Sequence, residues 1–251
     1  MNEWEELNNN ILNCKKCHLH ETRNIPIIGE GNKNSKFMII AQAPGRQENE
    51  KEKMFVGPSG KFLREIFKNI DLDFNSIYKT NLIKCFIPHC KRPNLKMIDS
   101  CKPFLLKEIM LINPDYIFTL GYYATREVFD YFNINMNNRD DFKNNFGKLF
   151  WSKNKKLVLF PHPASAIYNE EYKEGTKKLY EKINIITRTC KWFNLCPMKR
   201  FYGKGKLKRK WIELYCKGDW QSCKRFQMEE KGEYHPDNML PDGSIDESLE
   251  S

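Results

Sequence analysis

The sequence predicts an α/β protein: a three-layer α/β/α sandwich on a four-stranded parallel sheet, followed by a small, Cys-rich, mainly helical C-terminal module. Four short apolar runs, typical of buried strands, alternate with stretches of helical periodicity. A polar or Gly/Pro-rich loop follows each apolar run. Composition changes after Arg188, where cysteines and basic residues become frequent. Ligands bind beyond the carboxyl ends of parallel strands, so the loops there are the first place to look for a site.

Two helices and two strands are predicted in the first part of the chain. A helix with amphipathic spacing runs from Trp4 to Leu12, and residues 37–41 form a buried strand closed by Pro44-Gly45. A second amphipathic helix covers residues 59–70, and residues 77–83 form the next strand.

Helix and strand continue to alternate after this point. The predicted elements are helices over 97–112, 122–131 and 168–186 and strands over 116–120 and 157–160. The segment 133–156 is rich in Asn and Lys and is predicted to be a surface insertion. We therefore expect a first domain over residues 1–187 and a basic C-terminal module with an acidic tail over 188–251.

The charge balance indicates the kind of partner. The chain of 251 residues has 42 Lys and Arg against 32 Asp and Glu, a net charge of +10. A basic surface favours a polyanion, nucleic acid first, because phosphate neutralisation releases counterions. No apolar run approaches the ~20 residues that span a bilayer, and the first residues lack signal-peptide features. We expect a monomeric, cytoplasmic protein with no membrane association.

Nine cysteines need an explanation. An odd number without an export signal argues against a disulfide scaffold and favours metal or cluster ligation. Cys14 and Cys17 form a C-x2-C pair, which is uncommon by chance. A mid-chain group and a C-terminal group follow: Cys85, Cys90 and Cys101, then Cys190, Cys196, Cys216 and Cys223.

A series of short motifs between residues 10 and about 185 resembles, in order and spacing, the family 4 uracil-DNA glycosylases. The motifs are CKKC at 14–17, APG at 43–45, FVGPSG at 55–60, TNLIKC at 80–85, CKPFL at 101–105 and HP at 162–163. No single motif is decisive, but their order is specific. The resemblance implies a DNA repair enzyme that hydrolyses uracil from single- or double-stranded DNA and leaves an abasic site.

The resemblance also implies a four-iron four-sulfur cluster, which needs four thiolates brought together by folding. The implied ligands are Cys14, Cys17, Cys85 and Cys101. Zinc is the physical alternative for four cysteines, and buried free thiols are a third interpretation. Cys90 has no place in the family pattern and is interpreted as a spare thiol.

A glycosylase must hold a flipped base and stabilise charge on its oxygen. By resemblance, Phe55 stacks on uracil, Asn81 bonds the edge that distinguishes uracil from cytosine, and His162 donates to the charged oxygen. Each side chain suits its role. Taken singly, these residues are more often a core aromatic, a strand-end cap and a loop histidine; their joint occurrence at strand ends favours the catalytic interpretation.

One position departs from the family pattern. Where the family commonly has Gly-Glu-Ala-Pro-Gly, this chain has Ala41-Gln42-Ala43-Pro44-Gly45. Gln42 can orient a water molecule but cannot accept its proton. The backbone from Ala41 to Ala43 is expected to contact uracil, and Glu48 is a candidate substitute for the missing acid. A binding protein that has lost water activation is therefore an alternative, as is a glycosylase for another base such as hypoxanthine.

DNA binding requires further residues. The loop over 161–166 resembles the family segment that enters the minor groove, and Lys84, Lys91 and Arg92 are predicted to meet phosphates. Affinity should fall as salt rises. Partners beyond DNA are not predicted.

The C-terminal module combines cysteines, aromatics and a basic run over 199–210. Cys190-x5-Cys196 and Cys216-x6-Cys223 predict a second metal site, an iron-sulfur cluster or a zinc, because a unit with few aliphatic residues benefits from a metal. Reduced core cysteines are the alternative. His235 is predicted to lie on the surface.

Overall fold

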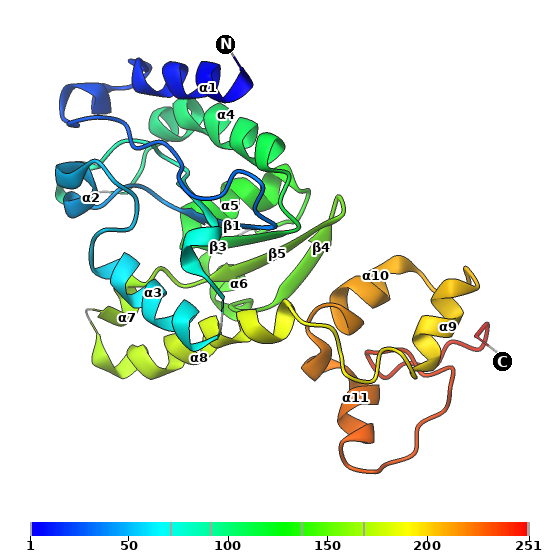
Figure 1. Ribbon diagram of the computed structural model, residues 1–251. Helices are drawn as coiled ribbons and strands as arrows, with labels where there is room; N and C mark the ends of the chain where they lie inside the picture. The colour runs from blue at the N-terminus through cyan, green and yellow to red at the C-terminus, as the bar shows by residue number, and fades with distance from the viewer. Residues whose placement is uncertain (1, 71, 91, 137, 168, 250–251) are drawn as a thin grey trace. The chain divides into compact units, whose positions relative to one another are not determined.

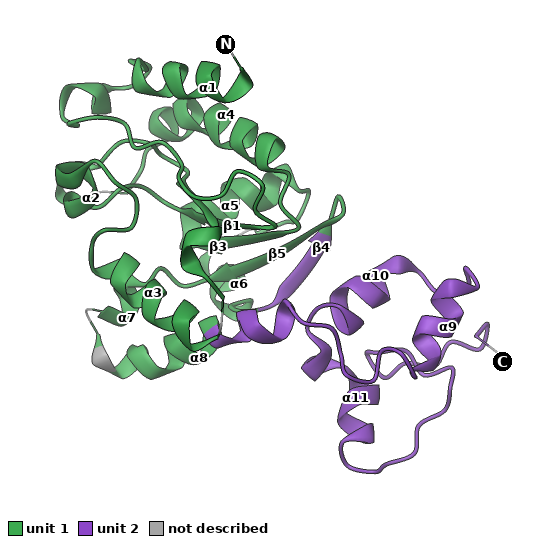
Figure 2. Ribbon diagram, viewed as in Figure 1, with its two compact units in different colours: residues 1–147, 152–180 green, residues 148–151, 181–251 purple. Residues whose placement is uncertain are grey.

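A computed structural model describes residues 2–70, 72–90, 92–136, 138–167 and 169–249, with the backbone alone for Cys90 and Glu170. The chain divides into two compact units (Figure 2). The first comprises residues 1–147 and 152–180, and the second comprises 148–151 and 181–251.

A five-stranded sheet in the order β2-β1-β3-β5-β4 forms the centre of the fold. The strands are β1 (Phe37–Ala41), β2 (Tyr78–Asn81), β3 (Tyr116–Leu120), β4 (Leu149–Ser152) and β5 (Lys155–Phe160). β1 pairs in parallel with β2 and β3, and β3 pairs in parallel with β5. The predicted α/β class is confirmed, with one strand more than the four expected.

The additional strand lies in the segment predicted to be a surface insertion. Residues 133–156 contain helix α6 (Arg139–Asn144) and strand β4. The two residues between β4 and β5, Lys153 and Asn154, both have positive φ, 47° and 60°. This is the backbone of a tight two-residue hairpin, so β4 runs antiparallel to β5. The apolar run in β4 is too short to stand out among the surrounding Asn and Lys.

Helices cover both faces of the sheet (Figure 1). α1 and α4 lie on one side, and α3 lies on the other. The helices of this part are α1 (Glu3–Leu12), η1 (His18–Glu21), α2 (Arg46–Lys51), α3 (Pro58–Asn69), η2 (Phe74–Ser76), η3 (Pro88–Cys90), α4 (Leu95–Ile112), α5 (Tyr122–Tyr131), α7 (Ala164–Ile167) and α8 (Glu170–Ile186). Tyr168, where the last of these was predicted to begin, lies outside the described residues. No helix in the described part of the chain has the length and apolar character needed to cross a membrane.

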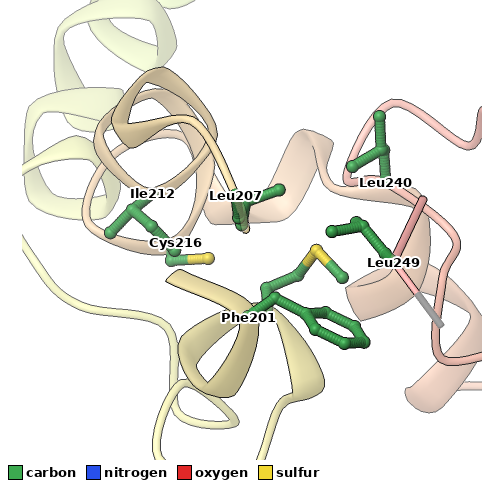
Figure 3. Packing of buried hydrophobic residues seen from close by; sticks show 7 residues of the cluster. Phe201, Leu207, Ile212, Cys216, Leu240 and Leu249 are labelled. Carbon is green, nitrogen blue, oxygen red and sulfur yellow. The ribbon is translucent and has the colours of Figure 1, made fainter. Parts of the chain in front are cut away.

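Beyond α8 the second unit contains short helices separated by stretches without regular structure. After the end of α8 its helices are α9 (Pro197–Gly203), α10 (Arg209–Trp211), the π-helix η4 (Ile212–Cys216), η5 (Trp220–Ser222) and α11 (Lys224–Glu229). Its core gathers residues from α9, η4 and the C-terminal stretch (Figure 3). Leu249 belongs to this core and is fully buried, so the C-terminal stretch contacts the core at this residue.

Candidate functional site

The site forms where β1 and β2 end side by side. Ala41 and Asn81 are directly opposite each other in the parallel ladder. The pairing continues into the loops, because the N–H of Leu82 donates to Ala41 O at 2.8 Å and that of Ile83 to Gln42 O at 2.9 Å. β1 lies between β2 and β3, so chain connections leave it in both directions, and ligands bind at such a switch point.

A cavity of about 490 Å³ opens at this edge of the sheet. It brings together five of the six residues predicted to bind the base, from strand ends and loops far apart in the sequence. They are Ala41, Ala43, Phe55, Asn81 and His162. Gln42 does not line the cavity, whereas Glu48 does. Arg46, Gln47 and Met54, which the sequence did not single out, also line it.

Phe55 is held in an unusual backbone conformation. Its φ is +51°, a left-handed value that is uncommon for a bulky residue and is found where the surroundings impose it. Arg64 donates to its carbonyl oxygen at 2.6 Å, and its ring meets the edge of Phe74 at 6.0 Å between centroids. A Cβ at Gly60 would overlap the same carbonyl oxygen. The backbone of Phe55 is therefore held by Arg64 and Gly60 and its ring contacts Phe74, which suits a stacking platform.

Asn81 is buried, and its Nδ2 donates to Met54 Sδ at 3.3 Å. A thioether is a weak acceptor, so the amide can exchange this contact for a stronger acceptor on a ligand. Its backbone oxygen accepts from Lys84 Nζ at 2.9 Å.

Lys84 is part of a buried network beneath the cavity, not of the DNA-facing surface. Its Nζ lies 2.6 Å from Glu108 Oε2, and both side chains are 1% exposed. It also donates to Thr80 Oγ1 at 2.6 Å, while Tyr78 OH donates to Glu108 Oε1 at 3.2 Å. The predicted phosphate contact is therefore wrong. The partner carboxylate, Glu108, lies on α4. It compensates the charge of the ammonium group in the interior, where water does not solvate it.

His162 lines the cavity, and its hydrogen bond suits a neutral imidazole that donates from Nε2. The N–H of Ala164 donates to its Nδ1 at 3.2 Å, so a neutral ring carries its proton on Nε2. Burial among protein atoms lowers the pKa of His162 to about 4, because desolvation disfavours the imidazolium. Pro161, the preceding residue, accepts a hydrogen bond from Tyr180 OH at 2.7 Å, and Tyr180 stacks on Phe160. This fixes the loop that presents the histidine.

Glu48 supplies a carboxylate to the cavity. Its Oε1 accepts from the N–H of Gly57 at 2.8 Å. The side chain also lies against Gly45, where an added Cβ would meet Oε2 at 2.5 Å. Glu48 thus connects the loop after β1 to the loop that carries Phe55. The candidate substitute for the acid missing from the 41–45 motif is thus a cavity-lining carboxylate on α2, seven residues after Ala41.

The N-terminal cysteines come from three segments of the chain. Cys85 and Cys101 are buried, and Cys14 and Cys17 are partly exposed. Cys85 lies within electrostatic range of Cys14 and Cys17, and Cys101 within range of Cys17 and Cys85.

A single arginine ties two of these segments together. Arg23 donates to Cys85 Sγ at 3.1 Å and to the backbone oxygen of Cys14 at 2.7 Å. The four thiols and this cation suit an anionic thiolate-bound group.

A closed single-ion site is a different arrangement. Within the described residues, no three His, Cys, Asp or Glu side chains are placed to hold one metal ion. The thiolates of a cluster bind different iron atoms and stand farther apart than the ligands of one ion, so this spacing is compatible with a cluster. The side chain of Cys90 lies outside the described residues.

The other predicted DNA contacts have different outcomes. Arg92 is exposed, and Lys91 lies outside the described residues. Arg46 is exposed beside the cavity and adds a cation that the sequence did not single out. The C-terminal cysteines line a separate cavity, of about 90 Å³, within the second unit.

Comparisons with known proteins give one consistent result. The family model described as uracil DNA glycosylase superfamily matches residues 28–185. A type-4 uracil-DNA glycosylase of Archaeoglobus fulgidus is 31% identical over 72% of this chain and 94% of its own length. Proteins of the same name from Sulfurisphaera tokodaii and Thermotoga maritima are 31% and 28% identical over 78% and 66% of this chain, and over 90% and 83% of their own lengths.

Proposed function

The chain belongs to the uracil-DNA glycosylase superfamily, and we propose that it is a DNA repair enzyme that hydrolyses the bond between uracil and deoxyribose, leaving an abasic site. The observation that carries the proposal is the cavity at the ends of β1 and β2. It combines an aromatic face, a side-chain amide and a neutral imidazole, which suit a flipped pyrimidine.

Phe55 and Asn81 bind the base in this proposal. The Phe55 ring stacks on uracil, in the position that its left-handed backbone and the Arg64 contact maintain. The Asn81 amide has one donor and one acceptor, which match the O4 and N3–H edge of uracil and mismatch that edge of cytosine. The contact from Lys84 to the Asn81 carbonyl oxygen holds the residue in register.

His162 stabilises the leaving group. As the C1′–N1 bond breaks, its electron pair passes to uracil, and negative charge develops on the ring and its O2 oxygen. The lowered pKa keeps the imidazole neutral near pH 7, and its Nε2–H donates to that oxygen without transferring the proton first. Removing one such donor commonly costs roughly 10²–10³-fold in rate.

Glu48 positions the attacking water. The water adds to C1′ of the oxocarbenium-like sugar and loses a proton, for which the Glu48 carboxylate is the acceptor in the cavity. This assigns to Glu48 the role that the amide of Gln42 cannot perform. Gln42 contributes through its backbone oxygen, which fixes the loop to Ile83.

A four-iron four-sulfur cluster held by Cys14, Cys17, Cys85 and Cys101 is part of the proposal. The donor set and the Arg23 contact to Cys85 support it. When bound, such a group ties three chain segments together. Because Cys85 follows the strand that ends in Asn81, this linkage steadies the base-binding edge.

The DNA backbone is bound by exposed cations, with Arg46 and Arg92 as the first candidates. The loop from Pro161 to Ala166 enters the minor groove as the base leaves the stack. We further propose that the protein acts as a monomer, which sedimentation analysis tests, and that it acts inside the cell, where its DNA substrate lies.

A single-turnover excision assay tests the function. Anaerobically purified protein is mixed with a labelled single-stranded oligonucleotide that contains one uracil, and alkali then cleaves abasic sites. We expect cleavage that depends on uracil, with a roughly 10²–10³-fold slower rate for His162→Ala. Oligonucleotides with cytosine, thymine or hypoxanthine in place of uracil are the matched controls.

Two results would contradict the proposal. Tight binding of the uracil oligonucleotide without any cleavage would indicate a binding protein. Cleavage at hypoxanthine but not at uracil would indicate a glycosylase with another base preference.

A further inference from the structure

The second unit contains a group of cysteines that the glycosylase site does not use. Its cavity of about 90 Å³ is lined by all four C-terminal cysteines and by several aromatic side chains. The cysteines are Cys190, Cys196, Cys216 and Cys223, from four places in the chain. Cys216 also belongs to the small hydrophobic core of the unit (Figure 3).

Distinct local structures deliver these cysteines. The N–H of Cys190 donates to Cys216 O at 2.7 Å, which joins the start of the unit to its centre. Cys216 ends the π-helix η4, in which Lys217 N–H reaches back five residues to Ile212 O at 2.9 Å. π-helical turns are rare and frequently lie at functional sites. Cys196 and Cys223 each stand at the residue before a helix, α9 and α11.

Backbone amide groups lie near two of the cysteine thiols. Those of Trp192 and Phe193 are close to Cys190, and the Phe193 N–H donates to the Cys190 backbone oxygen at 3.0 Å. Those of Arg225 and Phe226 are close to Cys223. Hydrogen bonds to sulfur stabilise metal-bound thiolates and tune iron-sulfur clusters, and a neutral thiol requires none of them.

A buried cation faces the same cavity. Arg225 lines it and is 2% exposed. Its Nη1 donates to the carbonyl oxygens of Pro236, Asp237 and Met239, but its Nε and Nη2 have no hydrogen-bond partner within the described residues. A buried guanidinium with two unused donors calls for an anion nearby, since an unpaired buried charge is costly. Four thiolates around a metal group carry net negative charge and supply it.

His235 also lines the cavity, and its side chain is 8% exposed. The prediction of a surface histidine is therefore wrong. Its Nε2 lies 3.0 Å from Glu229 Oε1 but outside hydrogen-bond geometry.

We propose that Cys190, Cys196, Cys216 and Cys223 bind an iron-sulfur cluster in the second unit, with Arg225 as its buried counter-charge. Two features favour a cluster over a zinc ion. The cavity exceeds several-fold the roughly 10–15 Å³ that one water molecule needs, so it has room for more than a single ion. The spacings of five and six residues lie outside the two to about four that zinc pairs typically have.

Iron and sulfide analysis of the full chain tests this proposal. The protein is reconstituted anaerobically with ferrous iron, sulfide and thiol, desalted, and analysed for iron, acid-labile sulfide and zinc. With one four-iron cluster in each unit, we expect about eight iron atoms per chain. The double variant Cys190→Ser/Cys196→Ser should keep about four, those of the first unit. The matched control, Cys14→Ser/Cys17→Ser, should also keep about four, which belong to the second unit.

Full iron content in Cys190→Ser/Cys196→Ser would overturn the proposal. So would one zinc per chain in the unaltered protein, if this zinc were absent from Cys190→Ser/Cys196→Ser and retained in Cys14→Ser/Cys17→Ser. Neither readout depends on uracil excision, so this proposal and the proposed function fail separately.

Alkylation of the unmodified protein guards against a variant that fails to fold. Cys190 and Cys196 are partly exposed, so free thiols there would react with iodoacetamide. We expect both to be protected in the reconstituted protein and modified after the cluster is removed by oxidant and chelator. Rapid modification before removal would overturn the proposal.

Discussion

Replacing Lys84 with methionine removes the cation from the buried network under Asn81. The change leaves the Glu108 carboxylate at 1% exposure, with Thr80 and Tyr78 as its hydrogen-bond donors. Breaking a buried ion pair from one side costs about 3–5 kcal/mol, because the remaining charge stays desolvated. At about 2–4 °C per kcal/mol for a chain of this size, the unfolding midpoint should fall by roughly 6–20 °C.

Thermal unfolding followed by circular dichroism under anaerobic conditions measures this effect. The double variant Lys84→Met/Glu108→Leu removes both charges and should recover most of the loss. Lys178→Met is the surface control, since that lysine is 72% exposed and its Nζ forms a weak ion pair, at 4.0 Å, with Glu174 Oε1. Its midpoint should change by no more than about 1–2 °C.

A midpoint for Lys84→Met within the range of the surface control would refute the reasoning. DNA binding provides a second test. If Lys84→Met weakened DNA binding and reduced its dependence on salt concentration, Lys84 would contact phosphate, and the buried placement of its ammonium group would be refuted.

Four further predictions concern the site. Because burial lowers the pKa of His162 to about 4, its protonation should not reduce the excision rate between pH 8 and about 5. The free energy of unfolding should nevertheless fall as pH drops from about 6.5 towards 4, since the unfolded chain takes up the proton first. The pH profiles of excision and of urea unfolding measure the two effects, with His162→Ala as control. Gly60→Ala should displace Phe55 and slow excision roughly 10²-fold, because the new Cβ overlaps the Phe55 carbonyl oxygen; excision at wild-type rate would contradict the close contact. Glu48→Gln should slow single-turnover excision by roughly 10²–10⁴-fold, whereas Gln42→Glu should remain active; the opposite order would assign water activation to position 42. Affinity for a single-stranded oligonucleotide, measured by fluorescence anisotropy, should fall steeply between about 50 and 200 mM salt, and insensitivity would count against phosphate contacts.

The sheet was predictable because its signals are local. Strands β1 and β3 and helix α5 begin and end where the apolar runs and Gly121 indicated. The side chains of the two strands are buried on both faces of the sheet. Burial on both faces produces continuous apolar runs, which can be recognised without tertiary information. β4 was missed because its run of three apolar residues is flanked by Lys and Ser and because its hairpin turn, Lys153-Asn154, has no glycine.

The errors in the site arise from pairing across long separations. Lys84 resembles a surface lysine until Glu108, 24 residues later, turns into the interior beside it. The sequence likewise gives no signal that Phe55 adopts a left-handed backbone or that Gln42 lies outside the cavity while Glu48 lies within it. Side-chain types at strand ends were predictable from the sequence; which of them face a common space depends on loop geometry.

The discontinuity of the second unit has a consequence for how the chain can be divided. Residues 148–151 group with residues 181–251 although the chain between them belongs to the first unit. An added Cβ at Gly218 would meet Leu149 Cδ2, so the late segment leaves space for the early one. A fragment that begins at residue 181 would lack these four residues, and we expect it to be less stable than the same unit within the full chain, because the surface that Leu149 covers would be exposed to water.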